Sequence, residues 1–267
     1  MKHFLITRFN LKVASWKTAK DGSAVLDDQW LENRFELFEK FCLPSVENQS
    51  NQNFIWVVFF DTDTPEKFRD RIQQISKNHK NFQTLYINGI VELADSFKTY
   101  IISQLEHDDQ FILTTRLDND DIIHRDFIQT IQNLSKKNGE SLIDLRKGYQ
   151  VNIVKKNAEI RKYNYAFNPF ISVLENRNHF ETIISRMHSE WENHEHIAIY
   201  NQKALWIELV HQKNKVNAVK RKLFMTRNIK LEDFSLEQKI NLPGLRMLIK
   251  TNSILKIKRF IRILRGR

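Results

Sequence analysis

Four short apolar runs in the first half of the chain alternate with longer amphipathic stretches. The runs cover residues 4–6, 54–60, 84–87 and 111–113. The second run is apolar at every position, which is typical of a strand buried on both faces of a sheet. Strands that alternate with helices favour a parallel sheet with right-handed crossovers. The pattern therefore predicts an α/β fold with a mostly parallel sheet flanked by helices.

The amphipathic stretches between these runs predict three helices. In the first, apolar residues and Arg34 recur at helical spacing from residue 30 to residue 41, before Pro44. In the second, Thr64 is the expected cap, Pro65 takes the first helical position, and residues 68, 72 and 75 form the buried stripe. Residues 93–105 give the third predicted helix.

The second half of the chain has a less regular pattern. We expect a helix whose apolar stripe begins at Ile123, and short strands near residues 142–143, 151–154 and 171–174. Another helix is expected from about His179 to Trp191. Its inward residues would be Phe180, Ile183, Ile184 and Met187. No repeat or linker is found before about residue 230, so we expect one domain over residues 1–230 and an extension over residues 231–267.

Three acidic residues follow the fourth apolar run within a few positions. Asp118, Asp120 and Asp121 come soon after Arg116. In parallel α/β sheets, ligands bind beyond the carboxyl ends of the strands, so polar residues that follow different strands meet at one edge. The other residues expected at this edge are Thr7, Arg8, Asp61, Asp63, Asn88 and Gly89.

Clustered carboxylates at a strand end are costly unless a cation or hydrogen-bond donors neutralise them. One or two carboxylates suit Mg²⁺ or Mn²⁺ when phosphate takes the remaining positions of the ion. Capping of the next helix is the structural alternative, because acids are favoured in a first helical turn. Three acids directly after a buried strand exceed what capping requires, so we expect a site for a metal-bound nucleotide.

The acidic segment resembles the Asp-x-Asp motif of GT-A-fold glycosyltransferases. Over roughly residues 3–220, the chain is similar to the bacterial family called putative rhamnosyltransferases. The matching segments are 7–9, 30–34, 42–45 with Gln49 or Gln52, 54–61, 114–121, His188 and 206–214. These matches in this order are far more specific than the acidic motif alone.

The resemblance implies a nucleotide-sugar donor and a divalent cation, either Mn²⁺ or Mg²⁺. Asp118 would face the donor ribose or the metal, and Asp120 would bind the cation that bridges the diphosphate. Arg8 and Arg116 would add charge-assisted bonds to phosphate, with ion pairs to the nearby aspartates as the alternative. Asp61 resembles the acid that contacts the base in many GT-A enzymes.

Two further roles rest on the resemblance and on general chemistry. His211 resembles a late histidine that is a third metal ligand in many GT-A enzymes, and Asn214 matches the family pattern; a structural histidine is the alternative. A reaction that inverts configuration needs a base for the acceptor hydroxyl. We select Glu190 and His188, although a solvated helix end explains each equally well. The absence of the Glu-Asp and Gln-x-x-Arg-Trp signatures leaves the base and the stereochemistry open.

The net charge of +10 is concentrated at one end of the chain. Residues 246–267 contain eight Lys or Arg and no acid, and the rest of the chain is close to neutral. Within this segment one side of a helical wheel is apolar and the other side is cationic, which is typical of binding to an anionic membrane surface. Docking onto the protein's own body is the alternative. The apolar side consists of Ile254, Ile257, Phe260, Ile261 and Leu264.

The remaining sequence features concern the compartment. No apolar run approaches the roughly 20 residues that cross a bilayer, and the N-terminus has no signal-peptide pattern. Cys42 is the single cysteine, so an intrachain disulfide is excluded. We therefore expect a cytoplasmic, peripheral enzyme at the inner face of the membrane. Its acceptor would be a saccharide or lipid-linked glycan of surface polysaccharide or lipopolysaccharide synthesis.

Two other classes of function remain open at this point. Asp61-Thr-Asp63 mimics the nucleophile motif of haloacid-dehalogenase phosphatases, although it follows the second predicted strand rather than the first. The other class is a non-catalytic basic protein that binds nucleic acid. Such a protein would spread its cations over the main surface, whereas here they lie at one end, so we expect no nucleic acid partner.

Overall fold

The computed structural model describes residues 1–13, 27–153, 157–211 and 218–264. Its larger sheet has seven strands in the order β10-β6-β9-β4-β1-β2-β3. Strand β9 is antiparallel to both of its neighbours, and the other pairs are parallel. The strands are β1 (Lys2–Arg8), β2 (Ile55–Asp61), β3 (Phe82–Ile87), β4 (Phe111–Arg116), β6 (Ser141–Leu145), β9 (Ser172–Asn176) and β10 (Ile197–Tyr200). This mostly parallel sheet confirms the expected GT-A-like α/β fold.

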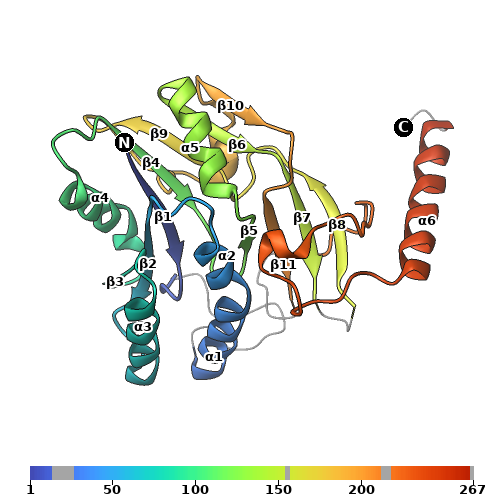
Figure 1. The fold of residues 1–267 in the computed structure, drawn as a ribbon, viewed down its shortest axis with the longest axis horizontal. Coiled ribbons are helices and arrows are strands. Elements are labelled where there is room, and N and C mark those ends of the chain that lie inside the picture. Colours follow the sequence, from blue (N-terminus) through green and yellow to red (C-terminus); the bar gives the residue numbers. More distant parts are fainter. Residues whose placement is uncertain (14–26, 154–156, 212–217, 265–267) are drawn as a thin grey trace.

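Helices and a second sheet complete the fold (Figure 1). The helices are α1 (Asp28–Leu37), α2 (Leu43–Glu47), α3 (Glu66–Asn78), α4 (Leu93–Gln104), α5 (Phe127–Asn138) and α6 (Leu245–Leu264). Short 3-10 turns are η2 (Ile90–Glu92), η3 (His188–Asn193) and η4 (Leu231–Phe234). The second sheet has the order β5-β11-β7-β8, with β5 (Ile122–Ile123), β11 (Trp206–Val210), β7 (Lys147–Asn152) and β8 (Glu159–Asn164). Strand β8, strand β10 and the pairing of β5 with β11 were not predicted from the sequence.

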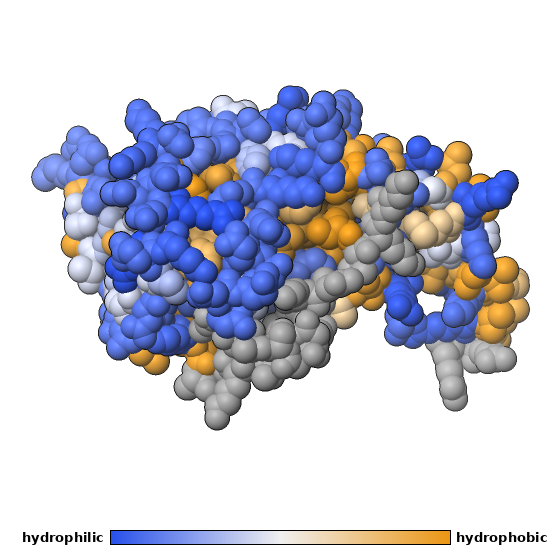
Figure 2. Space-filling model, turned by 90° about the horizontal axis from the view of Figure 1, so that it is seen from below, coloured by the Kyte–Doolittle hydropathy of each residue, from blue (hydrophilic) through white to orange (hydrophobic). Residues whose placement is uncertain are grey.

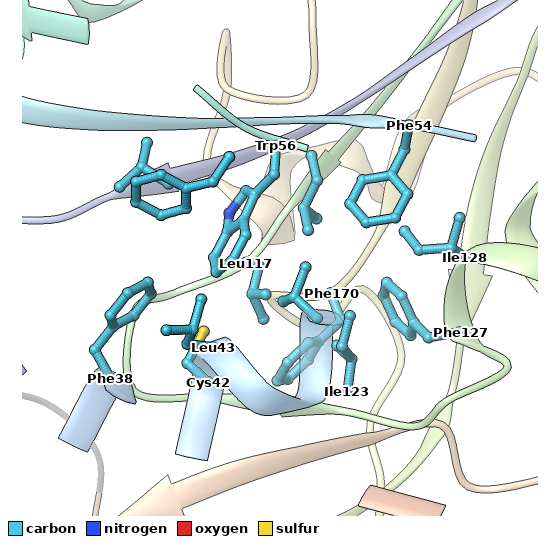
Figure 3. Packing of buried hydrophobic residues seen from close by; sticks show 14 of the residues in the cluster. Phe38, Cys42, Leu43, Phe54, Trp56, Leu117, Ile123, Phe127, Ile128 and Phe170 are labelled. Atoms are coloured by element: carbon cyan, nitrogen blue, oxygen red, sulfur yellow. The ribbon is translucent and has the colours of Figure 1, made fainter. Parts of the chain in front are cut away.

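The core between the larger sheet and the helices α1 and α2 is aromatic. Phe38, Trp56 and Phe82 lie within 6.2 Å of one another between ring centroids. Leu117, which is fully buried, packs in the same cluster as Cys42 and Trp56 (Figure 3). Because Leu117 directly precedes Asp118, this packing fixes where the acidic loop leaves the sheet.

The expected end of the first helix before Pro44 is wrong. A π-helical turn, Phe38–Cys42 (η1), follows α1, and α2 continues from Leu43 through Pro44. In the wider turn, the N–H of Leu43 bonds to the carbonyl of Phe38, five residues back. Proline follows near the start of α2, where its missing N–H costs little, so the helical segment does not break.

Two other local expectations are corrected by hydrogen bonds that compete with a helix. Pro65 is itself the N-cap of α3, and Thr64 Oγ1 instead donates to the carbonyl of Asp61 at 2.6 Å. The helix expected from about His179 to Trp191 is replaced by turns and by η3. The Glu175 carboxylate accepts from the N–H groups of Glu181 and Thr182, so these groups are bonded outside any helix. Met187, expected to point inward, is 60% exposed.

The C-terminal part of the chain combines a packed segment and an exposed helix. Phe234 and Leu236 are buried in a core cluster with Phe41 and Ile122, next to the second sheet. Helix α6 is attached through Asn252, whose side chain bonds both backbone groups of Met225 at 2.9 Å. None of the described helices is long and apolar enough to cross a membrane. Residues 265–267 of the predicted basic segment lie outside the described residues, and the boundary at 230 stays a prediction.

Gly148 on β7 lies against the indole of Trp206, and a Cβ placed on it would overlap the ring. We predict that Gly148→Ala lowers the free energy of unfolding by about 1–3 kcal/mol, as overpacking typically does. Denaturant unfolding of the purified protein measures this. Gly244→Ala is the matched control, because its nearest neighbour would lie 3.9 Å away. Equal stability of the two variants would contradict the close packing of β7 on β11.

Candidate functional site

The acidic loop begins where β4 ends, beside the end of β1. The N–H of Leu117 bonds to the carbonyl of Ile6, and the N–H of Asp121 bonds back to the carbonyl of Asp118 at 3.1 Å. Asn119 donates from its side chain to the carbonyl of Phe9 at 2.9 Å. These bonds hold the loop at the carboxyl edge of the parallel strands, so the expected meeting of polar residues at this edge is confirmed for the acidic loop and β1.

Asp118 lies between two arginines. Arg116 Nη2 contacts both of its carboxylate oxygens at 3.1 Å, and Arg8 Nη2 lies 3.6 Å from Oδ1. Burial would raise the pKa of Asp118, but the charges of Arg116 and Arg8 outweigh it and lower this pKa. The side chain of Asp118 is 33% exposed, and that of Arg8 is 34% exposed. A charged group from solution can therefore reach this cluster.

Asp120 is more deeply buried and connects three distant segments. Arg34 Nη1, from α1, lies 2.7 Å from its Oδ2, and His211 Nε2, just after β11, lies 3.0 Å from the same oxygen. Burial alone would raise the pKa of Asp120, but the Arg34 charge and the His211 hydrogen bond lower it well below its usual value. Asp120 is therefore ionised, with the cation of Arg34 fixed beside it.

Asp121 behaves in the opposite way. Its Oδ1 accepts the N–H of Leu209 at 3.0 Å, which links the acidic loop to β11. Burial and the nearby charges of Asp120 and Asp118 raise the pKa of Asp121 well above its usual value. Two adjacent carboxylates with pKa values shifted in opposite directions have different roles. Asp121 positions β11, which His211 directly follows, and Asp120 is the charged group.

The donor set of Asp120 and His211 fits a divalent cation. Two ligands about 3 Å apart can occupy neighbouring positions of an octahedron with bonds of about 2.1 Å. Imidazole beside carboxylate suits Mn²⁺ better than Mg²⁺. No group of three or more His, Cys, Asp and Glu in the described parts of the chain forms such a site by itself. Any cation would therefore take its other ligands from a bound phosphate, from water, or from Asp118 after this side chain turns away from Arg116.

Asp61 lies at the end of β2, at the expected edge of the sheet. It is almost fully buried, and its Oδ2 accepts the N–H groups of Lys12 and Gly89 at 3.0 and 3.2 Å. Its Oδ1 accepts the N–H of Asp63 at 3.1 Å. Asp61 therefore organises the loops after β1 and β3 at the same edge of the sheet. Its carboxylate bonds to backbone N–H groups, so Asp61 acts as a positioning residue for these loops.

The two residues selected as bases lie in η3 or at its start. Glu190 accepts the N–H of Met187 at 2.7 Å in a capping box, so its carboxylate caps the start of the exposed turn η3. His188 is half-buried, and Nδ1 bonds the carbonyl of Phe167. Since a carbonyl can only accept, Nδ1 bears the proton. Burial outweighs that bond and, together with the smaller effect of the Arg116 charge, lowers the pKa of His188.

Sequence reasoning missed three residues of this site as functional candidates. Arg34 was visible as a cation in an otherwise apolar helical stripe, which is the signal that could have identified it. Asn119 and Glu208 gave no comparable signal, because Asn119 acts through bonds to the end of β1 and Glu208 lies beside the acidic loop only through the pairing of β11 with β5. Asn214, which was matched with His211, lies outside the described residues.

A mostly parallel sheet with arginines and carboxylates at its carboxyl edge defines an α/β protein with a charged site where such sheets bind ligands. The chain belongs to a specific family: the family model described as "Putative rhamnosyl transferase" matches residues 2–223. This family is the one that the sequence resemblance indicated, and its description is that of a glycosyltransferase. No match was found among curated proteins.

Several solved structures are similar to this chain at low identity. Residues 1–349 of TarS from S. aureus, in complex with UDP-GlcNAc, are 15% identical with a TM-score of 0.48, over 83% of this chain and 63% of TarS 1–349. A putative nucleotide-diphospho-sugar transferase from Desulfovibrio desulfuricans is 9% identical with a TM-score of 0.41, over 95% and 96% of the two chains. The chain thus spans less than two thirds of TarS 1–349.

The ion pair of Arg34 with Asp120 gives a prediction with a defined pH dependence. Arg34→Met leaves a buried carboxylate without its cation, so we expect a loss of about 3–5 kcal/mol in the free energy of unfolding at pH 7. Because Arg34 lowers the pKa of Asp120 in the folded protein, its contribution is complete above the unfolded pKa of about 4 and shrinks as the pH falls below it.

Denaturant unfolding at pH 7 and pH 3.5 would check this prediction. Arg71→Met is the matched control, since Arg71 pairs with Glu32 and Glu39 on the helix surface, where such pairs contribute about 1 kcal/mol or less. The assigned ion pair of Arg34 with Asp120 would be contradicted if Arg34→Met lowered the free energy of unfolding only slightly. It would also be contradicted if this loss grew as the pH fell.

Proposed function

We propose that this protein transfers a sugar from a nucleoside-diphosphate donor to a saccharide or lipid-linked acceptor, with a divalent cation at the diphosphate. The observation that supports this most is the arrangement at the sheet edge. Asp118 and Asp120 lie on one loop, three arginines neutralise them, and His211 approaches Asp120 from the second sheet. An anionic ligand that brings its own cation matches this mixture of charges.

Binding of the diphosphate would rearrange the partners at Asp118. Arg8 and Arg116 offer planar donor groups that suit phosphate oxygens, and both now face a single carboxylate. A diphosphate with its cation can exchange partners there without leaving a charge unpaired. We propose Asp118 for the ribose or the metal, and Asp120 with His211 for the metal. Asp61 orders the loop beside the base through its bonds to backbone.

The cation would act as a Lewis acid on the departing diphosphate. Arginine side chains of this protein would stabilise the remaining negative charge on the diphosphate. As the bond between sugar and diphosphate breaks, negative charge builds up on the leaving group, and guanidinium groups fixed beside it stabilise that charge without reorganisation. Arg34 stays on Asp120 and keeps this carboxylate ionised and in place for the cation. Rhamnose, for which the family is named, is the sugar we propose to test first.

Helix α6 supports a peripheral location at an anionic membrane. The residues of its apolar side are exposed in the structure: Ile257, Phe260 and Leu264 are 58%, 61% and 70% accessible. Figure 2 shows hydrophobic and hydrophilic atoms together on this helix, which extends from the side of the body. Burial of such a face in lipid, with cations at the headgroups, is the behaviour of basic amphipathic helices. We propose a lipid-linked acceptor of surface polysaccharide synthesis on this ground.

The rival functions gain no support from the site. A phosphatase nucleophile must reach its substrate, but Asp61 is almost fully buried and both of its carboxylate oxygens accept backbone N–H groups. Nucleic acid binding needs cations spread over a surface, whereas the cationic excess of this chain is concentrated in residues 246–267.

We predict that one nucleoside diphosphate of a uridine, thymidine and guanosine panel stabilises the protein in the presence of Mn²⁺. At about 100 times the dissociation constant, the gain is ~2.7 kcal/mol, or roughly 5–10 °C in Tm. Asp118→Asn and Asp120→Asn should lose most of this shift, because they remove the groups that face the cation. Thermal unfolding followed by fluorescence measures it.

The matched control for this prediction is Asp63→Asn, whose side chain is 69% exposed at the same edge but makes its contact with Lys12. This variant should keep the shift of the wild type. No shift with any nucleotide, or an equal shift in Asp120→Asn, would contradict the proposed donor site.

We predict that α6 binds vesicles containing anionic phospholipid. The double variant Ile257→Ser, Ile261→Ser should bind vesicles about ten-fold or more weakly than the wild type. Full burial of an isoleucine side chain contributes ~1.5–3 kcal/mol, and each substitution removes part or all of this contribution. Vesicle sedimentation measures the binding. Val91→Ser is the control, since Val91 is 84% exposed on a different segment and should bind as the wild type does. Equal binding of the double variant, or no preference for anionic vesicles, would contradict this role.

A further inference from the structure

Glu208 lies on β11, one residue before the residue that ties this strand to the acidic loop. The N–H of Leu209 bonds to Asp121, and β11 pairs antiparallel with β5 through Trp206–Ile123 and Ile207–Ile122. If the register is continued by one residue, Glu208 lies opposite Asp121. The strand then leads to His211 at Asp120. Glu208 is therefore placed by the same pairing that builds the candidate donor site.

The side chain of Glu208 has a dedicated orienting partner. Gln150 Nε2 donates to Glu208 Oε2 at 2.7 Å, and the two residues are direct neighbours on β7 and β11. The amide of Gln150 is itself fixed, because its Oε1 accepts the N–H of Lys220 at 2.7 Å and its Nε2 also donates to the carbonyl of Ala218. Gln150 is fully buried and cannot turn its amide without losing these bonds.

The other carboxylate oxygen of Glu208 is available. Within the described part of the chain, Oε1 has no hydrogen-bond partner, and the residue is half-buried rather than enclosed. Burial raises the pKa of Glu208; the Gln150 bond and Lys220 oppose this, and the charges of Asp120 and Asp118 add to it. A carboxylate with a raised pKa and one free oxygen has the properties of a general base.

The sheet face around Glu208 is aromatic, with Trp206 fully buried and Tyr163 and Tyr165 partly exposed. Successive residues on one face of a strand alternate, so Glu208 shares its face with Trp206, and Gln150 shares it with Gly148, which contacts the indole of Trp206. Tyr163 lies on the same face of β8, at 5.6 Å from Trp206 between ring centroids. Tyr165 stacks on Tyr163 at 5.2 Å and touches the ring of His188.

An aromatic surface with a few placed polar groups is typical of small-molecule sites. Here it lies beside the acidic loop, because the N–H of Leu209 on β11 bonds to Asp121. This is where a second substrate would meet the donor sugar.

We infer that Glu208 is the group that takes the proton from the acceptor hydroxyl, with Gln150 as its positioning residue and Tyr163 and Tyr165 beside the acceptor sugar. This inference rests on the proposed glycosyl transfer. The acceptor oxygen forms a bond to the anomeric carbon, the bond from this carbon to the diphosphate oxygen breaks, and its electron pair leaves with the diphosphate. The hydroxyl proton passes to Glu208 Oε1. A direct displacement of this kind inverts the configuration.

The test compares Glu208→Gln with the wild type. First, calorimetry with the uridine, thymidine and guanosine diphosphates and Mn²⁺ identifies the nucleotide that binds. Second, release of that nucleotide from its sugar derivatives is measured with water or simple methyl glycosides as acceptors. We expect Glu208→Gln to bind the nucleotide as the wild type does, and its kcat to fall by roughly 10²–10⁴-fold with KM for the donor unchanged.

Glu175→Gln is the matched control. Burial also raises the pKa of Glu175, but it lies on β9 opposite Ile112, near the start of β4 and away from the site. Its release rate should equal that of the wild type. Glu208→Asp should retain part of the rate, because a shorter carboxylate can still accept a proton.

Each other outcome is decisive. The assignment of the base would be overturned if Glu208→Gln released the nucleotide at a rate within three-fold of the wild type. It would also be overturned if the release rate fell in a His188→Gln variant and not in Glu208→Gln. Nucleotide binding without release by the wild type would also overturn it, since a poised base activates water as well. No nucleotide binding by the wild type would instead refute the proposed function.

Discussion

The ion pair between Arg34 and Asp120 is the interaction on which the rest of the site depends. A carboxylate so deeply buried at the end of a strand is strongly destabilising unless a cation lies against it. Arg34 reaches it from α1, and His211 reaches it from the end of β11. One carboxylate thus joins the first helix, the acidic loop and the second sheet. Loss of its partner would loosen all three, because each is aligned by the same oxygen.

This arrangement explains why the acidic loop can be both folded and reactive. Asp120 is neutralised inside the protein, and Asp121 has a raised pKa and fixes β11. Asp118, by contrast, is partly exposed and shares its arginines at distances of 3.1 to 3.6 Å. The buried pair provides the stable frame, and the exposed cluster can exchange one anion for another. In our account, the donor diphosphate is that second anion.

The sequence predicted the parallel half of the fold because periodic patterns are local. Residues 54–60 read as a buried strand, and β2 spans Ile55–Asp61. One prediction was wrong because hydrogen bonds to a residue outside the segment replaced the bonds of the expected helix. Residues 179–191 have an apolar pattern typical of a helix, yet Glu175 takes the N–H groups of Glu181 and Thr182. The pattern of residues 179–191 alone cannot reveal this interaction, because Glu175 lies outside the segment.

The same distinction applies to the site. Asp118 and Asp120 were identifiable because three acids after an apolar run are unusual in a single stretch of sequence. Glu208 was not, because nothing local distinguishes a glutamate in a strand. Its significance comes from Gln150, which lies 58 residues earlier in the chain, and from the pairing of β11 with β5. Sequence patterns thus located the donor half of the proposed site, and tertiary pairing was needed to locate the acceptor half.

The central claim is that a diphosphate and its cation bind at the acidic loop. A crystal structure of the protein with Mn²⁺ and the nucleoside diphosphate that binds it would test this claim most directly, since anomalous scattering locates the metal without ambiguity. The account predicts one manganese peak about 2.1–2.3 Å from Asp120 and His211, with diphosphate oxygens against Arg8 and Arg116. A metal or nucleotide bound elsewhere, with the Asp118 and Asp120 pairs unchanged, would contradict it.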